Sequence, residues 1–289
     1  MRVFYAAIVS CGDEDCSISY IHMHGANQKF GPASETYAGF AWDYLRRNKD
    51  YCGAYSDRIQ TCDGVPKGSP IPSLRYAQSS DDLAHKWGLE CFAAPDNDAL
   101  KALVVWRQEA FPGALSVYYH KSCEAGNGED RFNLKHLDCE KQHYIRNDGT
   151  RISILKSEEF WLQLSGKPLD AEGEDQSFSV MIDGRKGARR RIDALRQLTS
   201  LSRNGTENFK LLGRQKAFLK MRNALTAYDI KANGGSYKDV AIALFGTEKV
   251  QCDWESSGGF LKARAIRSFK FGERMVAQDY QNLLPKKTI

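Results

Sequence analysis

The sequence predicts an α+β fold: N-terminal helices with a small antiparallel sheet, followed by an all-α, helix-turn-helix-like C-terminal domain. Two observations lead to this prediction. Apolar residues recur at helical spacing after residue 34, alternate between about 102 and 182, and return to helical spacing after 184. The 289 residues are 42% hydrophobic, which is enough to build ordinary cores.

Charge divides the chain near residue 184. Residues 185–289 carry 22 Lys and Arg against 9 Asp and Glu, a net +13, whereas residues 1–184 carry 19 against 27, a net −8. A strongly basic part favours nucleic acid as a partner. We therefore predict a poorly ordered extension (1–34), a mixed helix and antiparallel-sheet regulatory domain (35–184) and a helical DNA-binding domain (185–289).

Helical spacing predicts the first helix from Ser34 to about Tyr55. Its apolar positions are Tyr37, Phe40, Ala41, Tyr44, Leu45, Tyr51 and Tyr55. Arg46 and Arg47 fall on the opposite side, where they can contact DNA or, as this acidic half favours, form salt bridges. A shorter helix is expected to begin at Ser80 and end near Gly88.

Six short segments rich in aromatic and β-branched residues predict the strands of the sheet. They are "ALVVW" (102–106), "ALSVYY" (114–119), "QHYIR" (142–146), "RISIL" (151–155), "FWLQL" (160–164) and "FSVMI" (178–182). The sequence Asn147-Asp148-Gly149 is typical of a hairpin turn between two of them.

Four helices are expected after Gly184, at 188–202, 214–232, 236–246 and 259–276. The third, "SYKDVAIALFG", has Ser236 as its N-cap and Gly246 as its stop. The connection "TEKVQCDWESSGG" before the last helix is longer than the turn of a simple helix-turn-helix, and Trp254 within it is predicted to pack beneath that helix.

The last helix has an apolar side and a basic side. Its apolar side carries Leu261, Ala265, Ile266, Phe269 and Val276, and its other side carries Arg264, Arg267, Lys270, Phe271 and Arg274. An anchored helix that presents arginines outward has the geometry to enter a DNA major groove, where the arginine fork binds guanine O6 and N7 together. A solvated surface face is the alternative interpretation of the same pattern.

The motifs "GGSYKDVAIALFG", "DW", "LKARAIRSFKFGERM" and "DYQNLL" together resemble the C-terminal module of bacterial regulators of the FseA type. "AGFAWDYLRRNKDY" and "WGLECFAAPDNDALKALVVW" are similar to that family's N-terminal segments, so that the resemblance covers residues 35–284. It implies DNA binding, activation of excision genes of integrative and conjugative elements, and control by small antiactivator proteins. It carries a DNA-contacting role onto Lys262, Arg264, Arg267 and Arg274, with Lys238 as a phosphate contact.

The sequence gives little support for other chemistry. The set His120, Cys123, His136, Cys139 and His143 lacks two tight ligand pairs, and the same holds for Cys11, Cys16, His22 and His24. The eight cysteines show no repeating frame, which favours free thiols. No glycine-rich phosphate loop or nucleophile with its base is apparent. We therefore predict no catalytic residue, no metal and no cofactor.

The leading hypothesis is a cytoplasmic transcriptional activator of mobile-element genes that binds double-stranded promoter DNA through Lys238, Lys262, Arg264, Arg267, Lys270 and Arg274. Its acidic half would contact an antiactivator protein or RNA polymerase. No stretch approaches the roughly 18 apolar residues of a membrane span. Two alternatives stay open: a protein-binding antiactivator or adaptor without DNA affinity, and a metal-dependent enzyme of mobile DNA.

Overall fold

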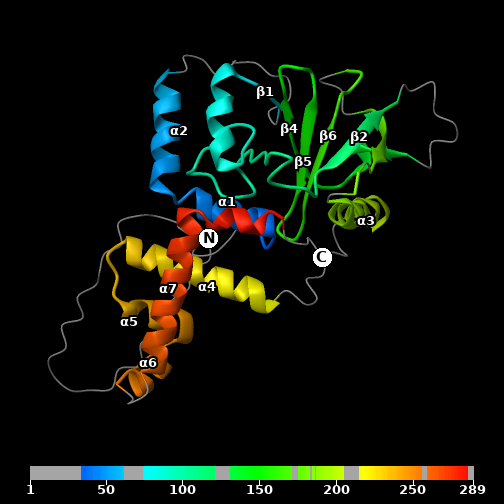
Figure 1. The fold of residues 1–289 in the computed structure, drawn as a ribbon. Helices are drawn as coiled ribbons and strands as arrows, with labels where there is room; N and C mark the ends of the chain where they lie inside the picture. The colour runs from blue at the N-terminus through cyan, green and yellow to red at the C-terminus, as the bar shows by residue number, and fades with distance from the viewer. Residues whose placement is uncertain are drawn as a thin grey trace, which may run out of the picture.

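The structure is a computed structural model that describes most of the chain after the N-terminal segment. The described residues are 34–61, 74–120, 131–170, 175–182, 184–185, 187–204, 215–255 and 259–285. Apart from Ser34, the predicted extension 1–34 lies outside the described residues. Figure 1 shows a sheet at one end of the molecule, the helices α4 to α7 at the other, and α1 between them.

The sheet is mixed and has seven strands in the order β1-β4-β5-β6-β2-β7-β3. The strands are β1 (Leu74–Tyr76), β2 (Leu115–Tyr119), β3 (Phe132–Asn133), β4 (Glu140–Ile145), β5 (Arg151–Lys156), β6 (Trp161–Gly166) and β7 (Ser177–Met181). The pairs β1–β4 and β2–β6 are parallel, and the other pairs are antiparallel. The small antiparallel sheet that the sequence predicted is therefore wrong.

The parallel pairs explain this error. Alternation tells which side chains face a core but not the direction of the neighbouring strand. The two strands β1 and β2 reach the sheet out of sequence order, through long connections whose course depends on tertiary packing. The predicted strand at 102–106 is also wrong, since Trp106 forms only an isolated bridge to Leu89. The predicted hairpin between β4 and β5 is confirmed, with Gly149 at φ 80°.

The single N-terminal helix predicted by the apolar spacing is two helices, α1 (Tyr37–Leu45) and α2 (Lys49–Thr61). The helix is interrupted before Lys49, because Asn48 caps α2. The side-chain oxygen of Asn48 accepts hydrogen bonds from the backbone N–H groups of Asp50 (2.9 Å) and Tyr51 (3.0 Å). The 3₁₀ helix η1 (Ser79–Trp87) ends at Gly88 with φ 78°, as the sequence predicted.

The C-terminal part is helical in its described residues. It contains α3 (Ala188–Asn204), α4 (Gln215–Ala232), α5 (Tyr237–Phe245), α6 (Thr247–Asp253), α7 (Phe260–Ala277) and η6 (Asp279–Leu283). Ser236 forms a capping box with Asp239 at the start of α5. The short helix α6 lies in the segment that the sequence predicted to be a connection, and Trp254 at its end packs in the same core as α7, as predicted.

These helices do not form a separate all-α, helix-turn-helix-like domain, and the predicted fold class is wrong in this respect too. Phe218 and Leu225 of α4 and Val276 of α7 share one core with α1 and with the sheet residues that face it. Helix α3 belongs to a second core against β2 and β6, through Ala194 and Leu198. Within the described ranges, no helix combines the length and apolarity needed to cross a bilayer.

Candidate nucleic-acid interface

Helix α7 is anchored along one side by apolar contacts and by a close approach to α4. Leu261, Ala265 and Val276 are buried on this side. Gly272 lies where the two helices meet, because a Cβ added there would stand 2.5 Å from the carbonyl oxygen of Ala224 on α4. Glycine is therefore the residue that allows the two backbones to come this close.

Helix α1 and the turn that follows it hold α4 and α7 together from the inner side. The guanidinium of Arg47 donates to both carboxylate oxygens of Asp229 on α4, at 2.6 and 2.8 Å. The Tyr44 hydroxyl donates to the carbonyl of Met221 on α4, and the Asn48 amide donates to the carbonyl of Val276 at the end of α7, both at 2.9 Å. The preference for salt bridges at Arg46 and Arg47 is confirmed. Both pair with Asp43 in the acidic half of the chain, at 2.8 and 3.7 Å, and Arg47 also pairs with Asp229 in the basic half.

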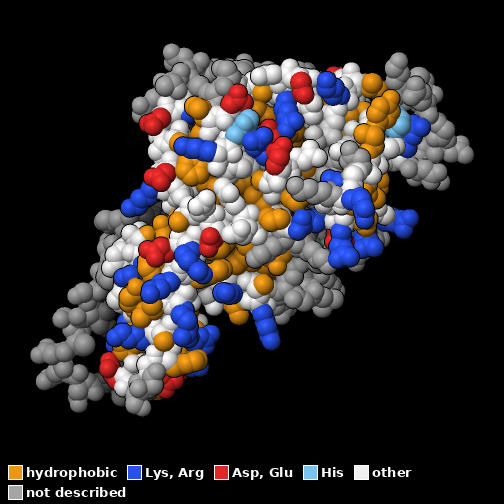
Figure 2. All heavy atoms as spheres, viewed as in Figure 1, with side chains coloured by type: hydrophobic (Ala, Val, Ile, Leu, Met, Phe, Trp, Pro, Cys, Tyr) orange, Lys and Arg blue, Asp and Glu red, His pale blue; other side chains and the backbone are white. Residues whose placement is uncertain are grey.

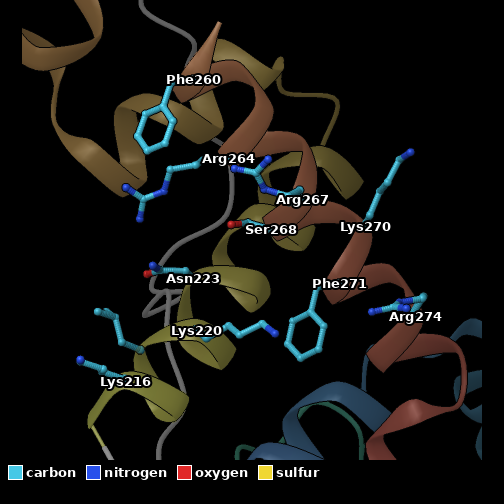
Figure 3. Close-up of a pocket in the computed structure, with 11 residues that line it drawn as sticks. Lys216, Lys220, Asn223, Phe260, Arg264, Arg267, Ser268, Lys270, Phe271 and Arg274 are labelled. Carbon is cyan, nitrogen blue, oxygen red and sulfur yellow. The ribbon is translucent and has the colours of Figure 1, made fainter. Parts of the chain in front are cut away.

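The outer side of the same two helices forms a groove of about 770 Å³. Figure 3 shows side chains from α4 on one wall and from α7 on the other. The lining residues are Lys216, Leu219, Lys220 and Asn223 of α4, with Phe260, Arg264, Arg267, Ser268, Lys270, Phe271 and Arg274 of α7. Figure 2 shows that Lys and Arg side chains gather over this helical end of the molecule, with apolar side chains among them.

The six cations of the groove are exposed and lack acidic partners. Each of these Lys and Arg residues is exposed to solvent. Among the described residues, no carboxylate lies within ion-pair distance of any of them, whereas Arg47 and Arg222 on the inner side are paired with Asp229 and Glu35. A surface of this kind attracts anions, and a phosphate backbone is the polyanion that a basic face most often meets.

Aromatic rings fix the position of several cations in the groove. The guanidinium of Arg264 lies 4.6 Å from the centre of the Phe245 ring and 5.5 Å from that of Phe260. The ammonium of Lys220 lies 4.3 Å from the centre of the Phe271 ring, which also contacts Arg274 at 6.0 Å. Such cation–π contacts hold the charged groups in place without neutralising them.

The structure brings together four of the six residues predicted to contact DNA. Arg264, Arg267, Lys270 and Arg274 line the groove, although the side chain of Lys270 points away from α4 in Figure 3. Lys262 is exposed on α7 but does not line the groove, because residues two positions apart on a helix project about 200° apart.

Lys238 lies on α5, is exposed, and does not line the groove either. The role of all six in DNA contact stays a prediction. The sequence reasoning missed Lys216 and Lys220, although their spacing of four residues, with Leu219 between them, already indicated a basic face on α4.

The geometry of the histidines does not support the alternative of a zinc-dependent enzyme. His120 forms a hydrogen bond of 2.7 Å with Ser179, and a ring nitrogen of His143 lies 2.9 Å from the Ser153 hydroxyl. In the described part of the chain, no three His, Cys, Asp or Glu side chains gather as a metal site would require. Cys123 and the set Cys11, Cys16, His22 and His24 lie outside the described residues.

Two family models match the chain. Residues 168–285 match the RovC type described as "T6SS, Transcription factor, DNA binding domain", and residues 32–91 match a "Proteobacterial transcriptional regulator-like domain". Among curated proteins the chain finds no match. The first match contains both walls of the groove, and the second contains α1.

The matches indicate a transcriptional regulator with a DNA-binding domain, which supports DNA as its partner. They support this broad class but do not extend to excision activators of the FseA type. Domains of transcriptional regulators also suggest a protein without catalytic activity.

Proposed function

We propose that the groove between α4 and α7 is the surface with which this regulator binds double-stranded promoter DNA. The observation that carries the proposal is the set of six exposed cations on the two walls, which no described carboxylate neutralises. A polyanion with regularly spaced charges is the ligand that suits these cations. Each phosphate that they neutralise releases condensed counterions, which favours binding. Arg264 and Arg267 add forks that can bind guanine as well as phosphate.

The proposal extends to the direction and target of regulation. Resemblance to FseA-type regulators supports activation of excision or transfer genes of a mobile element, working in the cytoplasm where the promoters are. The match to the T6SS transcription-factor domain supports a second class of targets, the T6SS genes. On either alternative, the N-terminal part that matches the regulator-like domain would contact RNA polymerase or an antiactivator protein.

The DNA fragments that co-purify with the protein test this function. We expect enrichment of a small set of promoter fragments, whose identity decides between mobile-element and T6SS targets. In gel shifts with these fragments, Arg264→Ala/Arg267→Ala should lose at least about 10-fold in affinity, since each well-placed fork contributes about 1–3 kcal/mol.

Lys49→Ala/Lys249→Ala is the matched control, because it removes two exposed cations that do not line the groove. It should bind as the wild type does. A protein that captures another protein but shifts no DNA would contradict the proposal and favour the antiactivator or adaptor alternative.

A further inference from the structure

We infer that α4 contributes a second row of phosphate contacts through Lys216 and Lys220, so that one strand of the DNA backbone runs along the groove between α4 and α7. This inference rests on the proposed function and specifies how the DNA is held. It differs from the sequence-based prediction, in which α7 alone meets the duplex as a recognition helix. The phosphodiester backbone is then the ligand of both walls.

The cations of the two walls follow the same groove. On α4, Lys216, Leu219, Lys220 and Asn223 are three or four residues apart and therefore share one side of the helix. On α7, the groove extends from Arg264 to Arg274, a rise of about 15 Å at 1.5 Å per residue. Consecutive phosphates of one strand lie farther apart along the backbone than their axial spacing of about 3.4 Å, so this length suits two or three of them.

Like charges on opposite walls favour an anion between them. The ammonium of Lys220 and the guanidinium of Arg274 both lie against the ring of Phe271. Two cations held by one ring repel each other, and a phosphate that contacts both would convert this repulsion into two favourable contacts. If the protein contacted DNA only through α7, the lysines of α4 would have no role in binding.

Polar groups between the two rows suit phosphate oxygens. Asn223 of α4 and Ser268 of α7 line the groove and are half-buried. An amide and a hydroxyl are donors that proteins commonly use toward the DNA backbone, where they fix register without reading sequence. Phe271 and Leu219 add apolar surface to the same groove, against which the sugars can pack.

The salt dependence of binding tests the inference. Fluorescence anisotropy with a labelled duplex of mixed sequence gives the affinity of the wild type and of Lys216→Ala/Lys220→Ala over a series of salt concentrations. We expect the slope of log K against log salt to become shallower by about 0.9 for each lysine removed. Affinity near physiological salt should fall on the order of 10-fold, and equally for unrelated duplexes, since phosphate contacts carry no sequence information.

Three further variants keep the outcomes distinct. Lys49→Ala/Lys101→Ala removes two exposed lysines that do not line the groove and should keep the wild-type slope. If Arg264→Ala/Arg267→Ala weakens binding while the α4 variant keeps both affinity and slope, the inference is overturned, and DNA binding through the α7 wall of the groove stands. If neither variant changes the slope, both fail. Lys216→Gln/Lys220→Gln repeats the measurement with neutral side chains that are longer than alanine, and circular dichroism checks that this variant is folded. It must give the same shallower slope.

Discussion

The inner and outer sides of the α4 and α7 pair differ in whether their charged side chains have partners. On the inner side, which faces α1, Arg47 is mostly buried and pairs with Asp229 at 2.6 Å. On the outer side, which lines the groove, the six Lys and Arg side chains are exposed and have no acidic partner among the described residues. Both sides belong to the same two helices.

This difference separates residues that hold the fold from residues available to a ligand. A buried charge must be paired, because removing it from water is unfavourable without compensation. An exposed charge has no such requirement, so unpaired cations can be kept for a partner. Changes on the inner side should therefore lower the free energy of unfolding, and changes on the outer side should lower DNA affinity with the fold intact.

The largest effect on stability is expected for Arg47→Met. The substitution leaves Asp229 without its cation and leaves the fully buried Asp43 with Arg46 alone, and burial has already raised the pKa of Asp43 because it disfavours the charged carboxylate. We expect a loss of about 3 kcal/mol in the free energy of unfolding, measured by urea denaturation.

Arg196→Met is the control for that change, since Arg196 pairs with Asp193 but its side chain is 72% exposed. Its effect should stay within about 0.5 kcal/mol, as for other surface substitutions. Equal losses in the two variants would contradict the distinction between buried and exposed charges.

Gly272→Ala should give the next largest effect. The added Cβ would stand 2.5 Å from the Ala224 carbonyl oxygen, so α7 must move away from α4. Overpacking of this kind lowers the free energy of unfolding by about 1–3 kcal/mol. In α2, Gly53→Ala meets nothing within 4 Å and should be neutral or stabilising by up to about 1 kcal/mol. Thermal denaturation of both variants checks the contrast, and an unchanged Tm for Gly272→Ala would refute the close approach.

A smaller loss is expected for Asn48→Ala. Its side chain caps α2 and also donates to the carbonyls of Val276 and Ala277, so it joins the N-terminal helices to the end of α7. Loss of a cap lowers stability by about 1 kcal/mol. Hydrogen exchange should show faster opening at the end of α7. Protection unchanged there would mean that α1 does not hold this end of the helix.

The smallest effect is expected for Phe260→Ala on the outer side. The ring is 57% exposed and stacks on Arg264, so its removal should leave the free energy of unfolding within about 0.5 kcal/mol of the wild-type value. DNA affinity should fall by about 2- to 5-fold, because an exposed cation–π contact contributes about 0.5–1 kcal/mol. A loss as large as that of Arg264→Ala would mean that the ring itself contacts DNA.

Local signals in the sequence predicted much of the secondary structure. The cap at Ser236, the turn at Gly149 and the helical spacing of α4 and α7 all depend on neighbouring residues and are confirmed. The parallel pairing of β1 and β2 and the shared core of α1 with α4 and α7 depend on residues far apart in the sequence, which periodicity does not report.

The candidate site was predictable only on one of its two walls. The basic stripe of α7 is visible because Arg264, Arg267 and Arg274 recur at helical spacing. The spacing of Lys216 and Lys220 indicates a basic face on α4, but their position opposite these arginines depends on tertiary packing, such as the close approach of Gly272 to Ala224, which the sequence does not report.

Lysine footprinting of the wild-type protein tests the central claim most directly. Acetylation with and without saturating duplex DNA, followed by mass spectrometry, reports which lysines the DNA covers. The account predicts that Lys216 and Lys220 become protected while the exposed Lys49 and Lys101 keep their reactivity. Undiminished reactivity of Lys216 and Lys220 in the complex would contradict a DNA backbone lying along the groove.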